Sequence, residues 1–177
     1  LGLNLSSLVY WFRDFWEVDR MEQSSEKSLD FEPPTDLPRL PRRLSDSSKY
    51  DYGRVVIVAG SRGMAGAAAL SSMAALRSGA GLVEVIVPES IQATVAGFDP
   101  CVMTYGLPED SEGRFALSAL AHIHKRCKRA DVVALGPGLG RSDDLVAIVH
   151  ELWKTLSMPA VIDADALWAL AQNSEWQ

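Results

Sequence analysis

The strongest constraint on the fold is an alternation of short apolar runs and longer segments of helical period, which begins after Gly53. Apolar runs of strand length occupy residues 54–59, 82–87, 101–105, 131–135 and 160–163. This alternation is typical of successive βαβ units, in which helices connect parallel strands. The runs are hydrophobic on both sides, as expected for strands that are buried on both faces. The sequence therefore predicts an α/β fold with a mostly parallel sheet between layers of helices.

One helix can be placed from the spacing of its apolar residues. Offsets of three and four recur along a single stripe made of Leu145, Ile148, Val149, Leu152, Trp153 and Leu156. Such a stripe is the buried face of an amphipathic helix. Ser142 suits the N-cap, and Asp143 and Asp144 suit the first turn, where the helix dipole favours negative charge.

The segment 114–130 is a second predicted helix, and it ends in the basic run HKRCKR. Its expected core face consists of Ala116, Leu120, Ile123 and Cys127. The basic end has two interpretations, a nucleic-acid patch or cations that complement a helix C-terminus, and the second is favoured. His122 and His124 are two residues apart and point in different directions on a helix, so no metal role is assigned to them.

Composition narrows the class of protein. The 177 residues are 47% hydrophobic and 23% charged, as in one globular domain, and the formal net charge of -6 disfavours a nucleic-acid partner. Cys101 and Cys127 lack the spacing of a zinc site or a disulfide framework, which favours a reducing cytoplasm. The apolar stretch 5–18 is too short for a membrane span and is interrupted by Arg13 and Asp14, and no targeting segment is recognised.

The N-terminal part differs in composition from the rest. Residues 21–52 are rich in Ser, Glu, Asp, Pro and Arg and show no sustained apolar period. We therefore expect residues 1–48 to form an irregular or disordered lead-in, and residues 49–177 to form the first part of a globular domain. Because MEQSSEKS at Met21 resembles a native beginning, residues 1–20 are expected not to belong to the working protein.

Three segments follow strands at the carboxyl edge of the predicted sheet, which is where open α/β sheets bind ligands. They are AGSRGMAGAAAL at residues 59–70, GPGLGRSDD at 136–144 and DADAL at 163–167. In the first of them, Gly60, Gly63 and Gly66 permit positive φ and leave the backbone bare. The following alanines begin a helix whose free N–H groups attract anions. Close packing of helix on sheet also requires small residues, so this loop alone leaves both explanations open.

The glycine patterns disfavour two common classes of nucleotide-binding enzyme. The spacing is GxxGxxG rather than GxGxxG, and Glu84 lies inside the second strand rather than at its end, which disfavours an NAD-type Rossmann enzyme. No GK[ST] follows a glycine run, which disfavours a Walker-type NTPase. In GPGLG, Pro137 fixes φ between Gly136, Gly138 and Gly140. Two glycine loops at one edge favour a ligand cleft over simple packing.

The carboxylates of DADAL belong to the same predicted edge. Asp163 and Asp165 can hold Mg²⁺ through water, orient a hydroxyl or cap the next helix. For Asp165, capping of the next helix and contact with a ligand both stay open, whereas Asp163 is favoured to face a ligand.

Three ordered motifs, which together cover about residues 40–172, identify a family. LPRRLSDSSKYDYGRVVIVAGSRGMAGAAALSSMAALRSGAGLVEVIVP, then ADVVALGPGLG, then MPAVIDADALWALA strongly resemble the ADP- or ATP-dependent NAD(P)H-hydrate dehydratases of the ribokinase-like superfamily. The resemblance implies a ribokinase-like three-layer sandwich, truncated here after the third loop unit. It also implies a nucleotide site and a hydrated-nicotinamide site in one cleft.

The resemblance further implies a lyase with a kinase-like first step. ADP or ATP, with Mg²⁺, would phosphorylate the ring hydroxyl of hydrated NADH or NADPH, and elimination of phosphate would restore the cofactor. The enzyme would be cytoplasmic and homo-oligomeric in its full-length form. The residues implied to contact or support the hydrated dinucleotide are Gly66, Ala67, Gly136, Gly138, Asp163 and Asp165.

The sequence departs from the family pattern near its end. The HPGE segment, the lysine-bearing nucleotide strand and the GTGD motif do not occur before Gln177. The catalytic base and the main anion hole are expected in that part, so this polypeptide alone is expected to turn over slowly or not at all, and to expose a sheet edge. Two alternatives stay open: a superfamily kinase of a small alcohol such as a vitamin precursor, and a non-catalytic dinucleotide-binding or interaction fragment. ADP versus ATP preference and a fused epimerase domain also stay open.

Overall fold

The computed structural model of the chain describes residue 40 and residues 42–173, which belong to one unit, Leu40–Gln177. The expectations for residues 1–39, including the one for residues 1–20, lie outside the described residues. Among the helices of the described part, none is long and apolar enough to cross a membrane.

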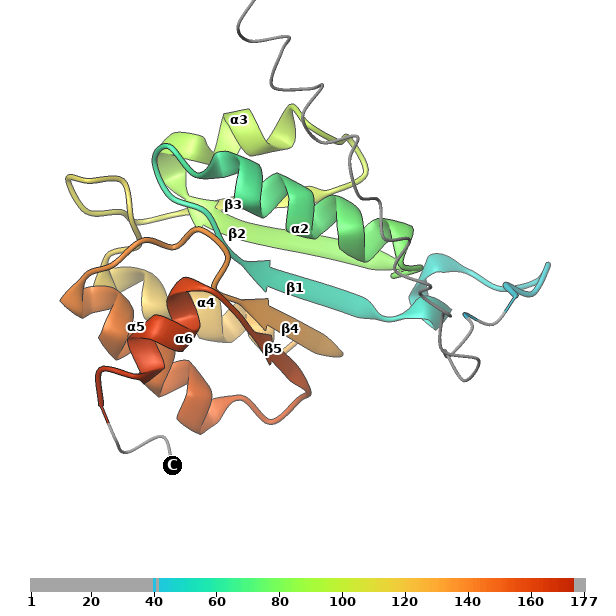
Figure 1. The fold of residues 1–177 in the computed structure, drawn as a ribbon. Coiled ribbons are helices and arrows are strands. Elements are labelled where there is room, and N and C mark those ends of the chain that lie inside the picture. The colour runs from blue at the N-terminus through green and yellow to red at the C-terminus, as the bar shows by residue number, and fades with distance from the viewer. Residues whose placement is uncertain (1–39, 41, 174–177) are drawn as a thin grey trace, which may run out of the picture. The chain divides into compact units, whose positions relative to one another are not determined.

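The five predicted strands are confirmed as one parallel sheet, shown in Figure 1. They are β1 (Arg54–Val58), β2 (Leu82–Pro88), β3 (Met103–Leu107), β4 (Val132–Leu135) and β5 (Ala160–Ile162), in the order β3-β2-β1-β4-β5. β3 begins later than predicted because the Asp99 carboxylate accepts the N–H of Cys101 at 2.8 Å, which keeps that residue in the preceding turn.

Helices cover both faces of the sheet. α2 (Ala65–Arg77) and α3 (Gln92–Ala96) lie on one face, while α4 (Leu120–Cys127), α5 (Asp143–Thr155) and α6 (Asp165–Leu170) lie on the other, as Figure 1 shows. The described residues also contain short 3₁₀ helices: η2 (Lys49–Tyr52) precedes β1, η3 (Glu89–Ile91) leads into α3, and η4 (Leu117–Ala119) leads into α4. The unit from residue 40 onward is therefore the predicted three-layer α/β sandwich.

The continuous apolar runs are explained by two cores. Along β1, Val56 and Val58 belong to the core under α4, α5 and α6. Ile57, between them, belongs to the core under α2 and α3, together with Val85 of β2. Because successive side chains of a strand point to opposite faces, burial on both sides requires apolar residues at every position.

The predicted helix from residue 143 is confirmed as α5. The Ser142 hydroxyl accepts the N–H of Leu145 at 3.1 Å, as expected of an N-cap. Trp153 differs from the prediction, because 43% of its surface is exposed. At 100° per residue it lies about 80° from Leu145 around the helix axis, at the margin of the buried stripe.

The segment predicted as one helix from residue 114 is instead a turn, a 3₁₀ helix and a shorter α4. Phe115 forms an antiparallel bridge with Glu109, so the chain reverses before the helix begins. As a result Phe115 and Ala119 are fully buried, while Ala116 is only partly buried. Ile123 and Cys127 are buried as predicted, and burial raises the pKa of the Cys127 thiol to about 12.

A buried ion cluster joins α4 to the sheet. Glu84 of β2 is 3% exposed and pairs with Arg54 of β1 and with Arg126 of α4, the latter at 3.4 Å. The Arg126 guanidinium also stacks 3.1 Å above the ring centre of Tyr105 in β3. Glu84 therefore has a structural partner on each side, which explains an acidic residue inside a buried strand.

Candidate functional site

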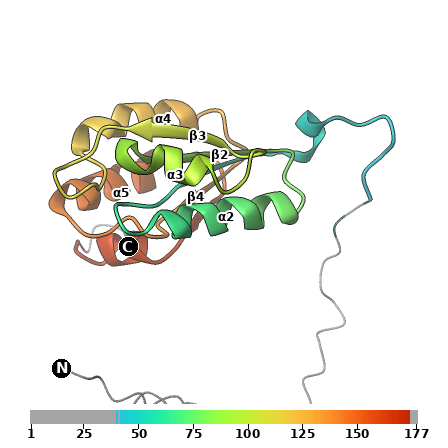
Figure 2. The same cartoon turned by 90° about the horizontal axis from the view of Figure 1, so that it is seen from above.

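The three predicted loops lie together at the carboxyl edge of the sheet. Because all five strands are parallel, the chain leaves β1, β4 and β5 at the same edge. Figures 1 and 2 show the loops after β1 and β4 gathered at one end, with residues 42–53, which precede β1, at the opposite end. Hydrogen bonds connect neighbouring loops: the N–H of Gly60 donates to the carbonyl of Pro137 at 2.8 Å, and the Ser61 hydroxyl donates to the carbonyl of Gly138 at 2.9 Å.

The loop after β1 is turned by two of its three glycines. Gly60 and Gly63 have φ of 81° and 83°, as the sequence predicts. Gly66 differs, because α2 already begins at Ala65 and Gly66 adopts helical backbone in the first turn. The turn therefore uses Gly60 and Gly63, and Gly66 needs another explanation.

In GPGLG the glycines are required by packing as well as by backbone angle. Gly136 and Gly138 have φ of 134° and 67°. A Cβ on Gly136 would lie 1.8 Å from the carbonyl oxygen of Asp163, and a Cβ on Gly138 would lie 2.8 Å from the Cβ of Ala67. The loop thus lies directly against both the α2 N-terminus and DADAL, and brings Gly66 and Ala67, Gly136 and Gly138, and Asp163 to one place.

The first turn of α2 is open at Gly66. A Cβ on Gly66 would meet no described atom within 4 Å. Met64, the N-cap residue, makes no side-chain cap hydrogen bond. The N–H of Ala67 donates to the carbonyl of Met64 at 3.1 Å. The first turn of α2 therefore combines free space at Gly66 with remaining backbone N–H groups that no cap side chain satisfies, which favours an anionic ligand.

The two aspartates of DADAL have different roles in the structure. Asp165 accepts the N–H of Gly140 at 2.9 Å through Oδ2. It is the first residue of α6, and the N-cap position belongs to Ala164, which has φ of 47° and no side-chain cap bond, so capping by Asp165 is wrong. The Asp163 backbone continues the sheet by donating to Leu135 at 3.0 Å, and the residue is exposed at the edge.

Sequence reasoning missed the turn that follows β3. The backbone N–H of Arg62 donates to the carbonyl of Gly113 at 2.9 Å, and the Arg62 guanidinium donates to the carbonyl of Ser111 at 2.9 Å. On its other side the turn reaches the GPGLGR loop, because Arg114 donates to the carbonyl of Arg141 at 2.8 Å. The run PEDSEGR indicates a turn, but nothing in it indicates these distant partners.

The carboxylates at the carboxyl edge of the sheet decide whether this part of the chain suits Mg²⁺. Within residues 40–173, apart from residue 41, no group of three or more His, Cys, Asp or Glu side chains is arranged to hold a metal ion. Mg²⁺ is usually held by one or two carboxylates, several waters and the phosphates of a nucleotide. Asp163, exposed at the edge, fits that arrangement, whereas Asp165 is already bound to Gly140.

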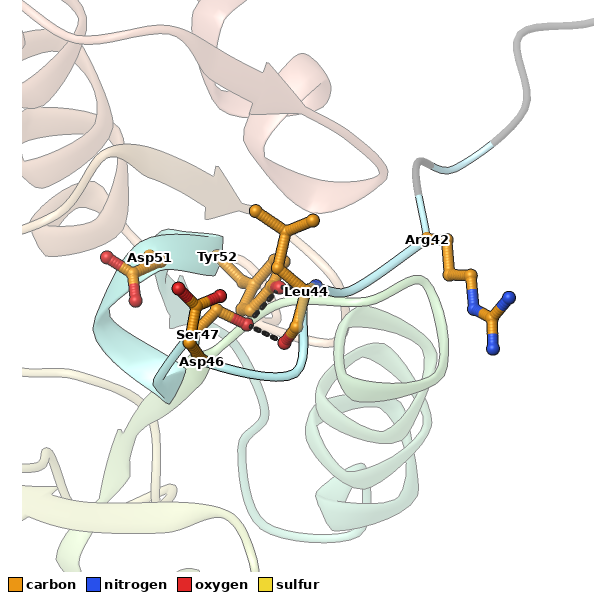
Figure 3. Close-up of a pocket in the computed structure, with 6 residues that line it drawn as sticks. All are labelled: Arg42, Leu44, Asp46, Ser47, Asp51 and Tyr52. Atoms are coloured by element: carbon orange, nitrogen blue, oxygen red, sulfur yellow. Dashed lines mark hydrogen bonds between the residues drawn. The ribbon is translucent and has the colours of Figure 1, made fainter.

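A wide hollow lies at the opposite edge of the sheet, near the start of β1. Its volume is about 570 Å³, and Figure 3 shows its lining residues: Arg42, Leu44, Asp46, Ser47, Asp51 and Tyr52. The polar groups there close the local turn. Ser47 donates to the carbonyl of Leu44 at 2.6 Å, and hydrogen bonds from the backbone and side chain of Ser48 lower the pKa of Asp51. These internal bonds account for the polar groups of Ser47 and Asp51, and no ligand is assigned to this hollow.

Comparison with known proteins gives one family. The model of the family described as NAD(P)H-hydrate dehydratase matches residues 55–177. The bifunctional NAD(P)H-hydrate repair enzyme of Moorella thermoacetica is 44% identical over 136 residues, which cover 77% of this chain and 26% of that protein. The corresponding enzyme of Salinibacter ruber is 41% identical over 132 residues, which cover 74% and 24%. The chain thus spans about a quarter of the length of these curated relatives.

Solved structures show the same fold. A ribokinase-like superfamily protein from Enterococcus faecalis matches with a TM-score of 0.62 and 28% identity, over 74% of this chain and 43% of that one. An ADP/ATP-dependent NAD(P)H-hydrate dehydratase from Bacillus subtilis, co-crystallised with ATP and Mg²⁺, matches with a TM-score of 0.56 and 27% identity, over 72% and 43%. The predicted ribokinase-like fold is confirmed.

Proposed function

The chain belongs to the NAD(P)H-hydrate dehydratase family, and on that premise we propose that it forms the dinucleotide-binding part of a nucleotide-dependent NAD(P)H-hydrate dehydratase. In this reaction the ring hydroxyl of hydrated NADH or NADPH takes a phosphoryl group from ADP or ATP. Loss of a neighbouring proton and departure of phosphate then form the ring double bond. The repaired dinucleotide is the product, so the enzyme is a lyase of metabolite repair.

Gly66 is the observation that carries the proposal. A glycine in a helix costs about 1 kcal/mol relative to alanine. The neighbouring glycines of GPGLG are explained by close contacts, but a side chain at Gly66 would meet open space. Neither backbone angle nor packing within the described residues therefore requires glycine there, whereas clearance for a bulky ligand does.

The other site residues are assigned roles around the open space beside Gly66. We assign Gly66, Ala67 and Gly138 to the surface that lies against the hydrated dinucleotide, with the N–H groups of the first turn of α2 facing its phosphates. Gly136 allows the loop to lie against DADAL, and Asp163 faces the ligand. Asp165 acts on the loop rather than on the substrate.

ADP or ATP and Mg²⁺ are the proposed co-substrate and metal. The Bacillus subtilis relative co-crystallised with ATP and Mg²⁺ supports them. Asp163 is the residue of this chain that would hold Mg²⁺, which neutralises charge on the phosphates when bound. We also propose a cytoplasmic location and a homo-oligomer in the full-length form. The free state of Cys101 and Cys127 agrees with a reducing compartment.

Calorimetric titration separates the candidate functions. We expect hydrated NADH or NADPH to bind more tightly than hydroxymethyl pyrimidines or thiazoles, because a dinucleotide spans both glycine loops. Nucleotide-dependent recovery of reduced nicotinamide absorbance in the same samples measures turnover. Phosphorylation of a hydroxymethyl compound without binding of the hydrated dinucleotide would favour the small-alcohol kinase instead. Turnover at ordinary enzyme rates would exclude the non-catalytic alternative.

Gly66→Ala is expected to stabilise the protein and to weaken ligand binding. Alanine in the first turn of α2 should raise the free energy of unfolding by about 0.5–1 kcal/mol. The added methyl should raise the Kd for hydrated dinucleotide at least tenfold, because it occupies ligand space. Urea unfolding and calorimetry measure the two effects.

The matched control for Gly66→Ala is Ala74→Gly. It makes the reverse change at an exposed position of the same helix, away from the glycine loops. It should lower stability by a similar amount and leave the Kd unchanged. Unaltered binding by Gly66→Ala would remove the main support for a ligand at this position.

A further inference from the structure

The turn between β3 and η4 is attached to both glycine loops. On one side, its Ser111 and Gly113 carbonyls accept hydrogen bonds from Arg62, which belongs to the loop after β1. A Cβ on Gly113 would lie 2.6 Å from the Cβ of Arg62, so only glycine permits this contact. Phe115, fully buried, anchors the end of the turn in the core.

Arg114 extends this attachment to the GPGLGR loop. Its Nε and one terminal nitrogen both lie 2.8 Å from Oδ2 of Asp110, and its other terminal nitrogen donates to the carbonyl of Arg141 at 2.8 Å. A Cβ on Gly140 would lie 3.1 Å from the Cδ of Arg114, so the stem of the side chain packs on the loop as well. A planar guanidinium with several donors can make both contacts at once.

Asp165, the first residue of α6, holds the same loop through a separate contact. Its carboxylate accepts the N–H of Gly140, the residue before Arg141. Leu139, next to Gly140, is 1% exposed and belongs to the core. Gly60 and Ser61 of the loop after β1 bind Pro137 and Gly138. The end of the GPGLGR loop is bound by Asp165 of α6 and by Arg114.

We propose that Arg114 and Asp165 are positioning residues that hold the GPGLGR loop in its binding geometry through separate contacts, without touching the dinucleotide. This proposal rests on the proposed function, because it assigns affinity for the hydrated dinucleotide to a preformed loop. Rigid loops bind more tightly because less conformational entropy is lost on binding.

The Asp110–Arg114 pair is expected to be intact at neutral pH. Burial would raise the pKa of Asp110, but the backbone and side-chain hydrogen bonds from Arg114 outweigh it and hold the pKa below the ordinary value of 3.8. A lowered carboxylate pKa contributes stability above the ordinary pKa, and that contribution is lost only as the pH falls through the folded value. The contacts that Arg114 and Asp165 make with the GPGLGR loop, called the brace below, therefore include an intact Asp110–Arg114 pair across the physiological pH range.

Four variants test the proposal. Arg114→Met keeps the apolar stem and removes the charged fork. Asp165→Ala removes the acceptor, while Asp165→Asn keeps an acceptor oxygen and removes the charge. Arg129→Met, at an exposed residue after α4, is the matched control for loss of an arginine. Thermal melting followed by circular dichroism establishes that each variant is folded.

Amide hydrogen exchange of residues 136–142, measured without ligand, is the first readout. We expect exchange at least tenfold faster in Arg114→Met and Asp165→Ala, and unchanged exchange in Arg129→Met. Asp165→Asn should stay within about threefold of the natural protein. Unchanged exchange in Arg114→Met and Asp165→Ala would overturn the brace, whatever the substrate is.

The Kd for hydrated NADPH is the second readout. We expect it to rise about tenfold in Arg114→Met and Asp165→Ala and to recover in Asp165→Asn. Faster exchange with an unchanged Kd would overturn the positioning role. No binding of hydrated NADPH by the natural protein would instead refute the proposed function, and the exchange result without ligand would still stand as a separate test of the brace.

Discussion

Gly136→Ala is expected to lower the free energy of unfolding by about 3 kcal/mol or more and to abolish binding of hydrated dinucleotide. The added methyl would lie 1.8 Å from the carbonyl oxygen of Asp163 and 2.9 Å from the Cβ of Ala166. Since the first of these atoms is backbone, no rotamer change can relieve the clash. The chain after β4 or after β5 must move, which separates GPGLG from DADAL. Urea unfolding and calorimetry check the two effects.

Gly63→Ala is the control that separates the clash with Asp163 in Gly136→Ala from the strain of a positive φ. Gly63 also has positive φ, at 83°, but a Cβ there would meet no described atom within 4 Å. Its replacement should cost only the strain of left-handed backbone, about 1–2 kcal/mol. Equal losses of stability in the two variants would show that contact with Asp163 does not decide the effect at Gly136.

The strands and the sheet edge could be predicted because their signals are local. Consecutive apolar residues such as Val56 and Ile57 indicate burial on both faces, and a parallel sheet then brings every strand's carboxyl end to one edge. The capped start of α5 at Ser142 is equally local. Trp153 shows the limit of such periodicity, because the width of the buried stripe depends on how far the sheet and α6 extend.

The reason for each glycine could not be predicted from the sequence. Gly66 and Gly138 look alike in a motif, yet one faces open space and the other meets Ala67. The difference depends on contacts between segments far apart in the chain. The brace at Arg114 was missed for the same reason, since its acceptor at Arg141 lies 27 residues away. The proposed role of Asp165 changes with its contact to Gly140, which the DADAL motif alone does not reveal.

Glu84 is held between two arginines, so removing it should have the second large effect on stability. The Glu84 side chain is 4% exposed, and those of Arg54 and Arg126 are 22% and 29% exposed. Breaking a buried ion pair from one side typically costs 3–5 kcal/mol, because the remaining charge keeps its desolvation cost. Since both guanidiniums retain some contact with water, we expect about 3 kcal/mol for Glu84→Ala and about 1–2 kcal/mol for Glu84→Gln, which keeps an acceptor.

Urea unfolding at neutral pH measures the loss, with Arg126→Ala as the matched comparison. Glu84 keeps Arg54 as a partner in Arg126→Ala, so this loss should be smaller than the loss in Glu84→Ala. Glu84 pairs with Val56 and Met103 in the first half of β2, away from the carboxyl edge. Folded Glu84→Ala should therefore bind hydrated dinucleotide with an unchanged Kd, unlike Gly136→Ala. A loss below about 1 kcal/mol in Glu84→Ala would mean that the attraction between the carboxylate and the two guanidiniums barely exceeds the cost of desolvating the carboxylate.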